Sequence, residues 1–204
     1  MATTSAPYGL RPVKRADGMA YAGATTTYLI DPAGEATSLF YGQVVYIGAD
    51  GYIAAVTTTG ADATTNSWPA GSSDMTGCIG VFVGCEYTND QGQVIHSQYY
   101  PAATANGGPI KAKVVDDPHV IFQGQMDAVS GQDDIGANCH FVTAKIVTGS
   151  TSTGNSTAQL DATVVQTTAP FRILGFVSPT DDTYPDVLVK INPAWHTMSI
   201  DKGV

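Results

Sequence analysis

The sequence predicts an all-β protein: a single β-sandwich or β-barrel (jelly-roll-like) domain preceded by an extended N-terminal arm. Only 13% of its 204 residues are charged, against roughly 25% in an average globular domain, so the Glu, Lys and Arg of surface helices are scarce. From residue 25 onward, short runs of Val, Ile, Tyr, Phe and Thr alternate with Gly, Asp, Asn and Pro, which is the pattern of strands and turns. The length suits one hydrophobic core.

Residues 1–24 show neither hydrophobic period and contain Pro7 and Pro12. Each proline fixes its own φ and drives the preceding residue toward an extended conformation, so we expect an arm with a reach of roughly 80 Å when fully stretched. Apolar and basic side chains are mixed here, which suits binding to another protein. The candidate binding residues are Pro7, Tyr8, Leu10, Arg11, Pro12, Val13, Lys14 and Arg15. A disordered tail is the alternative that these residues leave open.

Residues 25–204 are predicted to form the β domain. The expected strands are residues 26–30, 43–47, 52–56, 78–87, 94–100, 110–115, 120–125, 139–147, 160–165, 171–177 and 187–191. The second and third are joined by Gly48-Ala49-Asp50-Gly51, whose residues tolerate the positive φ of a tight hairpin. The best helix signal lies in residues 32–40. The Thr- and Ser-rich segments 57–76 and 148–157 are expected to be exposed loops.

The net charge of −9 is unevenly distributed. Residues 1–24 hold three basic residues and one acid, so they carry +2 and the rest of the chain −11. An acidic domain is a poor ligand for phosphate backbones, so we expect no nucleic-acid partner. We also expect no membrane partner, because neither a signal peptide nor a run of roughly 20 apolar residues is present. The three cysteines, an odd number, are expected to be reduced and buried.

The search for catalytic and metal-binding motifs is negative. The histidines lack the close spacing of a local metal site, and no P-loop, nucleophile elbow or HExxH motif occurs. Asp116-Asp117 and Asp181-Asp182 resemble calcium ligands or the paired acids of a glycoside hydrolase, but turn chemistry accounts for both pairs, as it does for Asp133-Asp134. We therefore predict no enzyme activity, no cofactor and no metal.

The ten tyrosines and two tryptophans offer a further kind of site. Tyr and Trp pack a ring against an apolar partner while the polar end stays hydrated, so they suit protein interfaces and sugar-binding faces alike. We expect most of them in the core or at a subunit interface. A carbohydrate platform that includes Trp68 is the alternative.

Several segments spread along the chain resemble the head decoration (capsid cement) proteins of tailed bacteriophages, especially those of aquatic hosts. They are residues 6–13 (APYGLRPV), 21–25 (YAGAT), 38–45 (SLFYGQVV), 80–87 (GVFVGCEY), 97–101 (SQYYP), 171–176 (FRILGF) and 186–192 (DVLVKIN). The resemblance implies a protein made in the host cytoplasm that assembles on the capsid exterior of the virion. It also implies the major capsid protein as partner, a homotrimer over local symmetry axes, and no catalytic residues.

Three functional hypotheses follow. In the first, the protein stabilises the phage head as a decoration protein, and residues 1–24 bind the capsid or a neighbouring subunit. In the second, it is a receptor- or glycan-binding virion component, associated with a tail or fibre, that uses exposed tyrosines and Trp68. The third, a hydrolase built on Asp116, Asp117, Asp181 and Asp182, has the least support.

Overall fold

The structure, a computed structural model, describes residues 4–56, 78–102, 108–164, 169–179 and 182–197. In these residues the protein is all-β, with eleven strands and three single-turn 3-10 helices (Gln132–Asp134, Thr143–Lys145 and Pro193–Trp195) and no α-helix. None of the helices in this part of the chain has the length and apolar character needed to cross a membrane.

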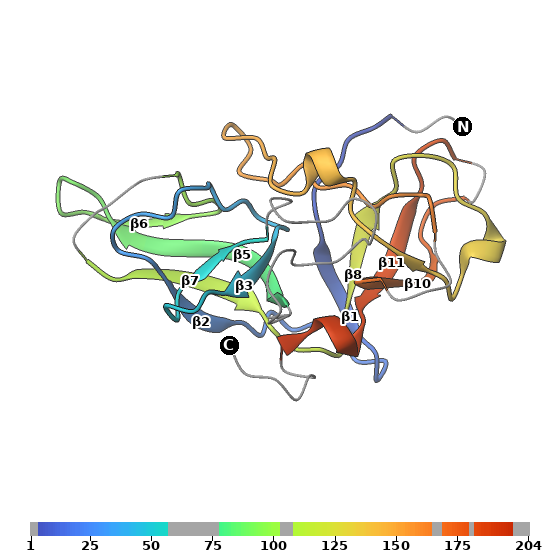
Figure 1. The fold of residues 1–204 in the computed structure, drawn as a ribbon, viewed down its shortest axis with the longest axis horizontal. Coiled ribbons are helices and arrows are strands. Elements are labelled where there is room, and N and C mark those ends of the chain that lie inside the picture. Colours follow the sequence, from blue (N-terminus) through green and yellow to red (C-terminus); the bar gives the residue numbers. More distant parts are fainter. Residues whose placement is uncertain (1–3, 57–77, 103–107, 165–168, 180–181, 198–204) are drawn as a thin grey trace.

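Two antiparallel sheets pack together, as the sequence predicts for a β-sandwich (Figure 1). The first sheet has the order β1 (Arg11–Arg15), β8 (Val120–Gln125), β11 (Asp186–Ile191), β10 (Phe171–Phe176) and β9 (Asn138–Cys139). The second has the order β2 (Thr26–Ile30), β7 (Ile110–Val115), β5 (Cys78–Thr88), β3 (Val44–Ile47) and β4 (Ile53–Ala55), and β6 (Val94–Ser97) pairs with β5.

The part of the second sheet where β3 pairs with β5 is buried on both faces, toward which successive side chains of a strand point alternately. Val44 and Val81 belong to the hydrophobic cluster shared with the first sheet. Their neighbours Val45 and Phe82 belong to a second cluster on the other face. The two end strands of this sheet, β2 and β4, also contact each other without forming a ladder, so the sheet curls around the second cluster.

Most of the predicted strands are present, and the exceptions lie in the C-terminal half. Residues 139–147 were expected to form one strand, but only the two-residue β9 and a 3-10 turn form there. Residues 160–164 make isolated bridges through Leu160. The helix predicted over residues 32–40 is also absent: Gly34 N–H donates to Asp31 O in a turn, and no helical repeat follows.

The N-terminal arm is not confirmed. Its residues 11–15 form β1, which pairs with β8 and completes that edge of the first sheet. Leu10 is fully buried in the core shared by the two sheets. Burying a leucine side chain stabilises the folded state by about 2 kcal/mol, so this segment gains more by docking on its own chain than by staying extended in water.

Two Tyr-Gly segments, Tyr8-Gly9 and Tyr41-Gly42, cross where the N-terminal segment meets the second sheet. Leu10 N–H donates to Gly42 O at 2.8 Å, and both Gly9 (φ +73°) and Gly42 (φ +84°) have left-handed backbones. A Cβ on Gly9 would lie 2.5 Å from Gly42 O and 2.9 Å from Ser156 Cβ. Only glycine permits so close an approach at positive φ.

The same crossing includes the segment 148–157, which was expected to be exposed. Its Ser156 is fully buried and donates its N–H to Tyr41 O at 2.8 Å. Gly154 O accepts the Tyr41 N–H at 2.9 Å. Although its tip is exposed, this polar loop therefore contacts both Tyr-Gly segments, because its small residues fit where three segments of the chain meet.

Candidate interaction surfaces

The exposed side chains around β1 form a surface that combines basic and apolar groups. We define the β1 surface as Arg11, Val13, Lys14 and Met19. Val13 is 42% exposed and Met19, in the turn that follows β1, is 64% exposed. Arg11 and Lys14 are exposed, and the described part of the chain offers no ion pair to either of them. This surface offers a partner apolar contact next to positive charge that no carboxylate of the described chain neutralises.

A β-bulge produces this arrangement. The register between β1 and β8 shifts between Pro12 and Lys14, so Val13 has no partner on β8. In a regular strand two successive side chains would point to opposite faces, whereas a bulge redirects one of them. Val13 and Lys14 are consequently both exposed, and they place an apolar and a cationic side chain next to each other.

The outer edge of β1 is poorly suited to pairing with a further strand. Pro12 has no N–H to donate, and the N–H of Arg15 already donates to Met19 O at 2.8 Å. Lys14 also forms an isolated bridge with Ala20. Prolines, bulges and lysines are the devices by which edge strands avoid edge-to-edge association. A partner would therefore recognise this segment mainly through its side chains.

The other residues selected in the sequence hold the segment onto its own chain. Tyr8 donates its hydroxyl to Asp186 Oδ1 at 2.9 Å, and burial together with this carboxylate raises the pKa of Tyr8. Arg11 lies over the Tyr8 ring, 4.2 Å from its centre. Arg15 is paired with Asp17 and Asp117. Pro7 and Pro12 are partly buried. Of the eight selected residues, only Arg11, Val13 and Lys14 are exposed.

No protein-family model, no curated protein and no solved structure matches this chain.

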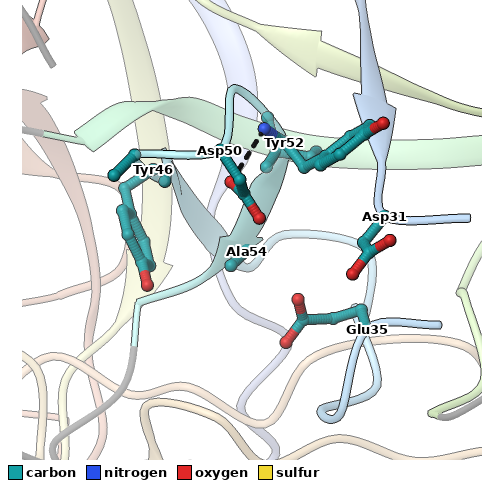
Figure 2. A pocket seen from close by; sticks show the side chains of 9 residues that line it. Asp31, Glu35, Tyr46, Asp50, Tyr52 and Ala54 are labelled. Atoms are coloured by element: carbon teal, nitrogen blue, oxygen red, sulfur yellow. Dashed lines mark hydrogen bonds between the residues drawn. The ribbon is translucent and has the colours of Figure 1, made fainter. Parts of the chain in front are cut away.

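A pocket of about 440 Å³ lies at the end of the second sheet where β2 and β4 approach each other. Its polar lining comes from Asp31 and Glu35, which follow β2, and from Tyr46, Asp50 and Tyr52 of the β3–β4 hairpin. Figure 2 shows the three carboxylates turned toward the space in front of Ala54, with the Tyr46 ring on one side.

The electrostatics of this pocket favour a cation. None of the described residues that line it is basic. Burial raises the pKa of Glu35, and the nearby charges of Asp31 and Asp50 raise it further, while the bond from Thr37 N–H opposes the shift. The Oδ1 of Asp50 accepts the Tyr52 N–H at 3.1 Å, which fixes the hairpin turn. A positive group entering here would relieve the mutual repulsion of three carboxylates.

Sequence reasoning missed this pocket. Asp31 and Glu35 are separated from Asp50 by a strand, and the two groups meet only because the second sheet curls until β2 contacts β4. That curl depends on the pairing of β2 with β7, whose residues lie far along the chain. The local signal was limited to the hairpin turn itself.

Among the acidic pairs noted in the sequence, Asp117 and Asp134 accept local hydrogen bonds in turns, whereas Asp116 bonds to a tyrosine of β2. Asp117 Oδ1 accepts the His119 N–H at 2.8 Å, and Asp116 Oδ2 accepts the Tyr28 hydroxyl at 2.8 Å. Asp134 accepts bonds from Ser130 and Gly131. Asp182 is buried, whereas Asp181 lies outside the described residues. Within the described ranges, no cluster of three or more His, Cys, Asp or Glu side chains could hold a metal ion.

The prediction for the cysteines is confirmed, whereas the proposed carbohydrate platform lies partly outside the described residues. Cys78, Cys85 and Cys139 are free and buried, as the sequence predicts. Trp68 lies outside the described residues. Of the adjacent tyrosines considered for an aromatic platform, Tyr100 is fully buried in the core and Tyr99 stacks on Phe40 with ring centres 5.7 Å apart.

Proposed function

We propose that this protein binds the outer surface of a bacteriophage capsid and stabilises the head as a decoration protein. The β1 surface is the surface through which it assembles, either on the major capsid protein or on a neighbouring copy. The observation that carries this proposal is the exposure of Arg11, Val13 and Lys14 on one bulged edge strand of an otherwise acidic chain. Arg11 and Val13 also belong to the segment 6–13, which resembles the decoration proteins, and Lys14 follows it directly.

The physical properties of the molecule suit this role. A rigid two-sheet body presents a preformed surface, so little conformational entropy is lost when it binds. A protein that binds only the assembled shell stabilises that shell by mass action. A homotrimer, which the resemblance implies, would add valency if the three surfaces reach the shell together.

The receptor- or glycan-binding alternative has weaker support. It was based on Trp68 and on exposed tyrosines. Tyr100 is buried, and Tyr99 is only partly exposed and stacks one ring face on Phe40. No described aromatic pair favours this function over decoration.

A decoration assay with point variants tests the proposal. Val13→Asp places a charge in the β1 surface, and Val94→Asp makes the same change at a valine that is 59% exposed on β6. Heads of the phage that encodes the protein, assembled without it, are mixed with each variant and sedimented. We expect wild type and Val94→Asp to co-sediment with the heads, and Val13→Asp to bind at least tenfold more weakly, since burying an unpaired charge at an interface costs several kcal/mol.

Point variants are needed because deletion of residues 1–24 would remove β1 and the buried Leu10, and so would destabilise the whole fold. If Val13→Asp decorates heads as tightly as Val94→Asp does, the β1 surface is not the assembly surface. If wild type itself fails to bind, the protein is not a decoration protein.

A further inference from the structure

We infer that the β1 surface of one copy binds the acidic pocket and an adjoining apolar cavity of a second copy of this chain. This inference deepens the proposed function, since it rests on the β1 surface being the assembly surface and names its partner. It requires no capsid, so it is tested on the purified protein in solution.

The acidic pocket selects an organic cation rather than a metal ion. Its volume of about 440 Å³ far exceeds that of a bare ion, and its carboxylates do not form a cluster that could hold a metal ion. An ammonium or guanidinium group at the end of a long side chain satisfies carboxylates that are spread around a pocket, and it also interacts favourably with the Tyr46 and Tyr52 rings.

A second cavity adjoins the pocket and has a different chemistry. Leu29, Ile30, Pro32, Tyr52, Gly108 and Pro109 line it, and its volume is about 270 Å³. Tyr52 lines both cavities, so the acidic pocket and the apolar cavity meet at this residue. Leu29 is 44% exposed, which leaves apolar area for a partner to cover. The combined site therefore fits a segment that presents a cationic and an apolar side chain next to each other.

The β1 surface presents this pair. Val13 and Lys14 are adjacent and both exposed because of the bulge. Lys113 is also exposed without an ion pair in the described chain, but its strand neighbours Ala112 and Val114 are buried, so it lacks an exposed apolar neighbour on its own strand. Three other basic side chains have partners. Lys111 pairs with Glu86 at 3.3 Å, Arg15 pairs with Asp17 and Asp117, and Arg172 bonds to Asn138. Lys14 thus combines a charge that has no ion pair in the described chain with an exposed apolar neighbour.

Charge complementarity favours a second copy as the occupant. The chain carries −9 overall, with +2 in residues 1–24 and −11 elsewhere, so copies attract each other when the basic segment of one faces the acidic part of another. Two β1 surfaces facing each other would instead bring like charges together. Because donor and acceptor are different surfaces, the contact is head-to-tail, and it closes into a ring if the rotation between neighbours allows it.

A charge-exchange experiment measured by analytical ultracentrifugation tests this contact. Lys14→Glu reverses the donor, and Asp50→Lys reverses an exposed carboxylate of the acceptor. Lys113→Glu is the matched control, since it reverses an exposed lysine on β7 that lines neither cavity. Circular dichroism and thermal unfolding confirm that each variant is folded, and Glu35→Gln is a milder acceptor variant if Asp50→Lys does not fold.

We expect wild type and Lys113→Glu to self-associate at about 100 µM in low salt, where a contact with a Kd of about 10 µM is largely formed. Each single reversal should weaken association at least tenfold, and the Lys14→Glu/Asp50→Lys double variant should recover most of that loss. A monomeric wild type, or a double variant that is no better than the single ones, overturns the inference. Decoration of heads by a monomeric wild type would overturn this contact while leaving the proposed function standing.

Discussion

Alanine at Gly9 tests whether the N-terminal segment is a fixed part of the fold. Gly9 and Gly18 both lie in residues 1–24 and have similar backbones, with φ +73° and +87°. The two differ in their surroundings: a Cβ at Gly9 would lie 2.5 Å from Gly42 O, whereas a Cβ at Gly18 would have no atom within 4 Å. Gly18→Ala is therefore a matched control for the cost of positive φ alone.

The expected loss in the free energy of unfolding for each variant follows from the surroundings of its glycine. An L-residue in the left-handed region costs about 1–2 kcal/mol, and alanine recovers about 0.4–1 kcal/mol through the unfolded chain. Gly18→Ala should therefore cost about 0–1.6 kcal/mol. Gly9→Ala carries the same terms plus a collision with backbone atoms. Relieving that collision strains the bond from Leu10 N–H to Gly42 O, worth about 1 kcal/mol, and disturbs the packing of Leu10, for which overpacking costs about 1–3 kcal/mol.

Urea unfolding followed by fluorescence measures the difference in free energy of unfolding between the two variants. We expect Gly9→Ala to lose about 3 kcal/mol more than Gly18→Ala, which lowers the midpoint by about 1 M or more for a typical dependence on urea. Equal losses for the two variants would refute the crossing of the Tyr-Gly segments, and with it the docked position of β1.

Three further predictions concern the interior of the molecule. Leu10→Ala should lower the free energy of unfolding by about 2–5 kcal/mol, since Leu10 is fully buried. Val13→Ala, at a site 42% exposed, should change it by no more than about 0.5 kcal/mol. Similar effects of the two substitutions in urea unfolding would mean that the N-terminal segment is not docked on the body. The three thiols should react with a disulfide reagent at pH 8 only when the protein unfolds. Burial raises the pKa of Cys78 and Cys85 to about 12 and also raises the pKa of Cys139. Rapid reaction of the native protein would contradict the burial of these thiols. Desolvation lowers the pKa of His140 and His196 in the folded state, against the opposing effect of nearby carboxylates. Below a pH of about 6.5 the unfolded state therefore binds more protons than the folded state. The free energy of unfolding should fall as the pH is lowered through this range. His140→Gln should flatten this pH dependence. An unchanged slope in that variant would exclude His140 as a source.

The sequence predicts the parts of this fold whose signals are local. The β3–β4 hairpin is marked by the four residues of its turn, and Gly48 N–H donates to Tyr52 O at 2.8 Å as a tight hairpin requires. The turn that joins β5 to β6 likewise depends on Asn89, whose side chain accepts the N–H groups of Gln91 and Gln93. In both cases the residues that define the structure are neighbours in the chain.

The fate of the N-terminal segment could not be predicted in this way. Residues 11–15 lack an alternating pattern because β1 contains a bulge, and their partner β8 lies more than a hundred positions later. Prolines at 7 and 12 point correctly to extended backbone, but they do not reveal whether the extended chain joins its own sheet or another molecule. The exposed part of the segment, Arg11, Val13 and Lys14, is the part of the predicted site that stays available to a partner.

The expected helix at residues 32–40 shows a second limit. Its alanines and Glu35 favour a helix weakly, yet the Asp31 side chain accepts the Ala33 N–H at 2.8 Å and starts a turn instead. This local bond competes with helix formation. The turn places Asp31 and Glu35 in the acidic pocket. The turn that forms in place of the predicted helix therefore also contributes to a pocket that the sequence does not predict.

A reconstruction of the intact phage head at side-chain resolution tests the central claim most directly. If the protein is a decoration protein, we expect density for this chain on the outer surface of the capsid, with Val13 and Lys14 buried in a contact with the shell or with a neighbouring copy. Density for the chain at a tail or fibre, or on the capsid with Val13 and Lys14 facing solvent, would contradict it.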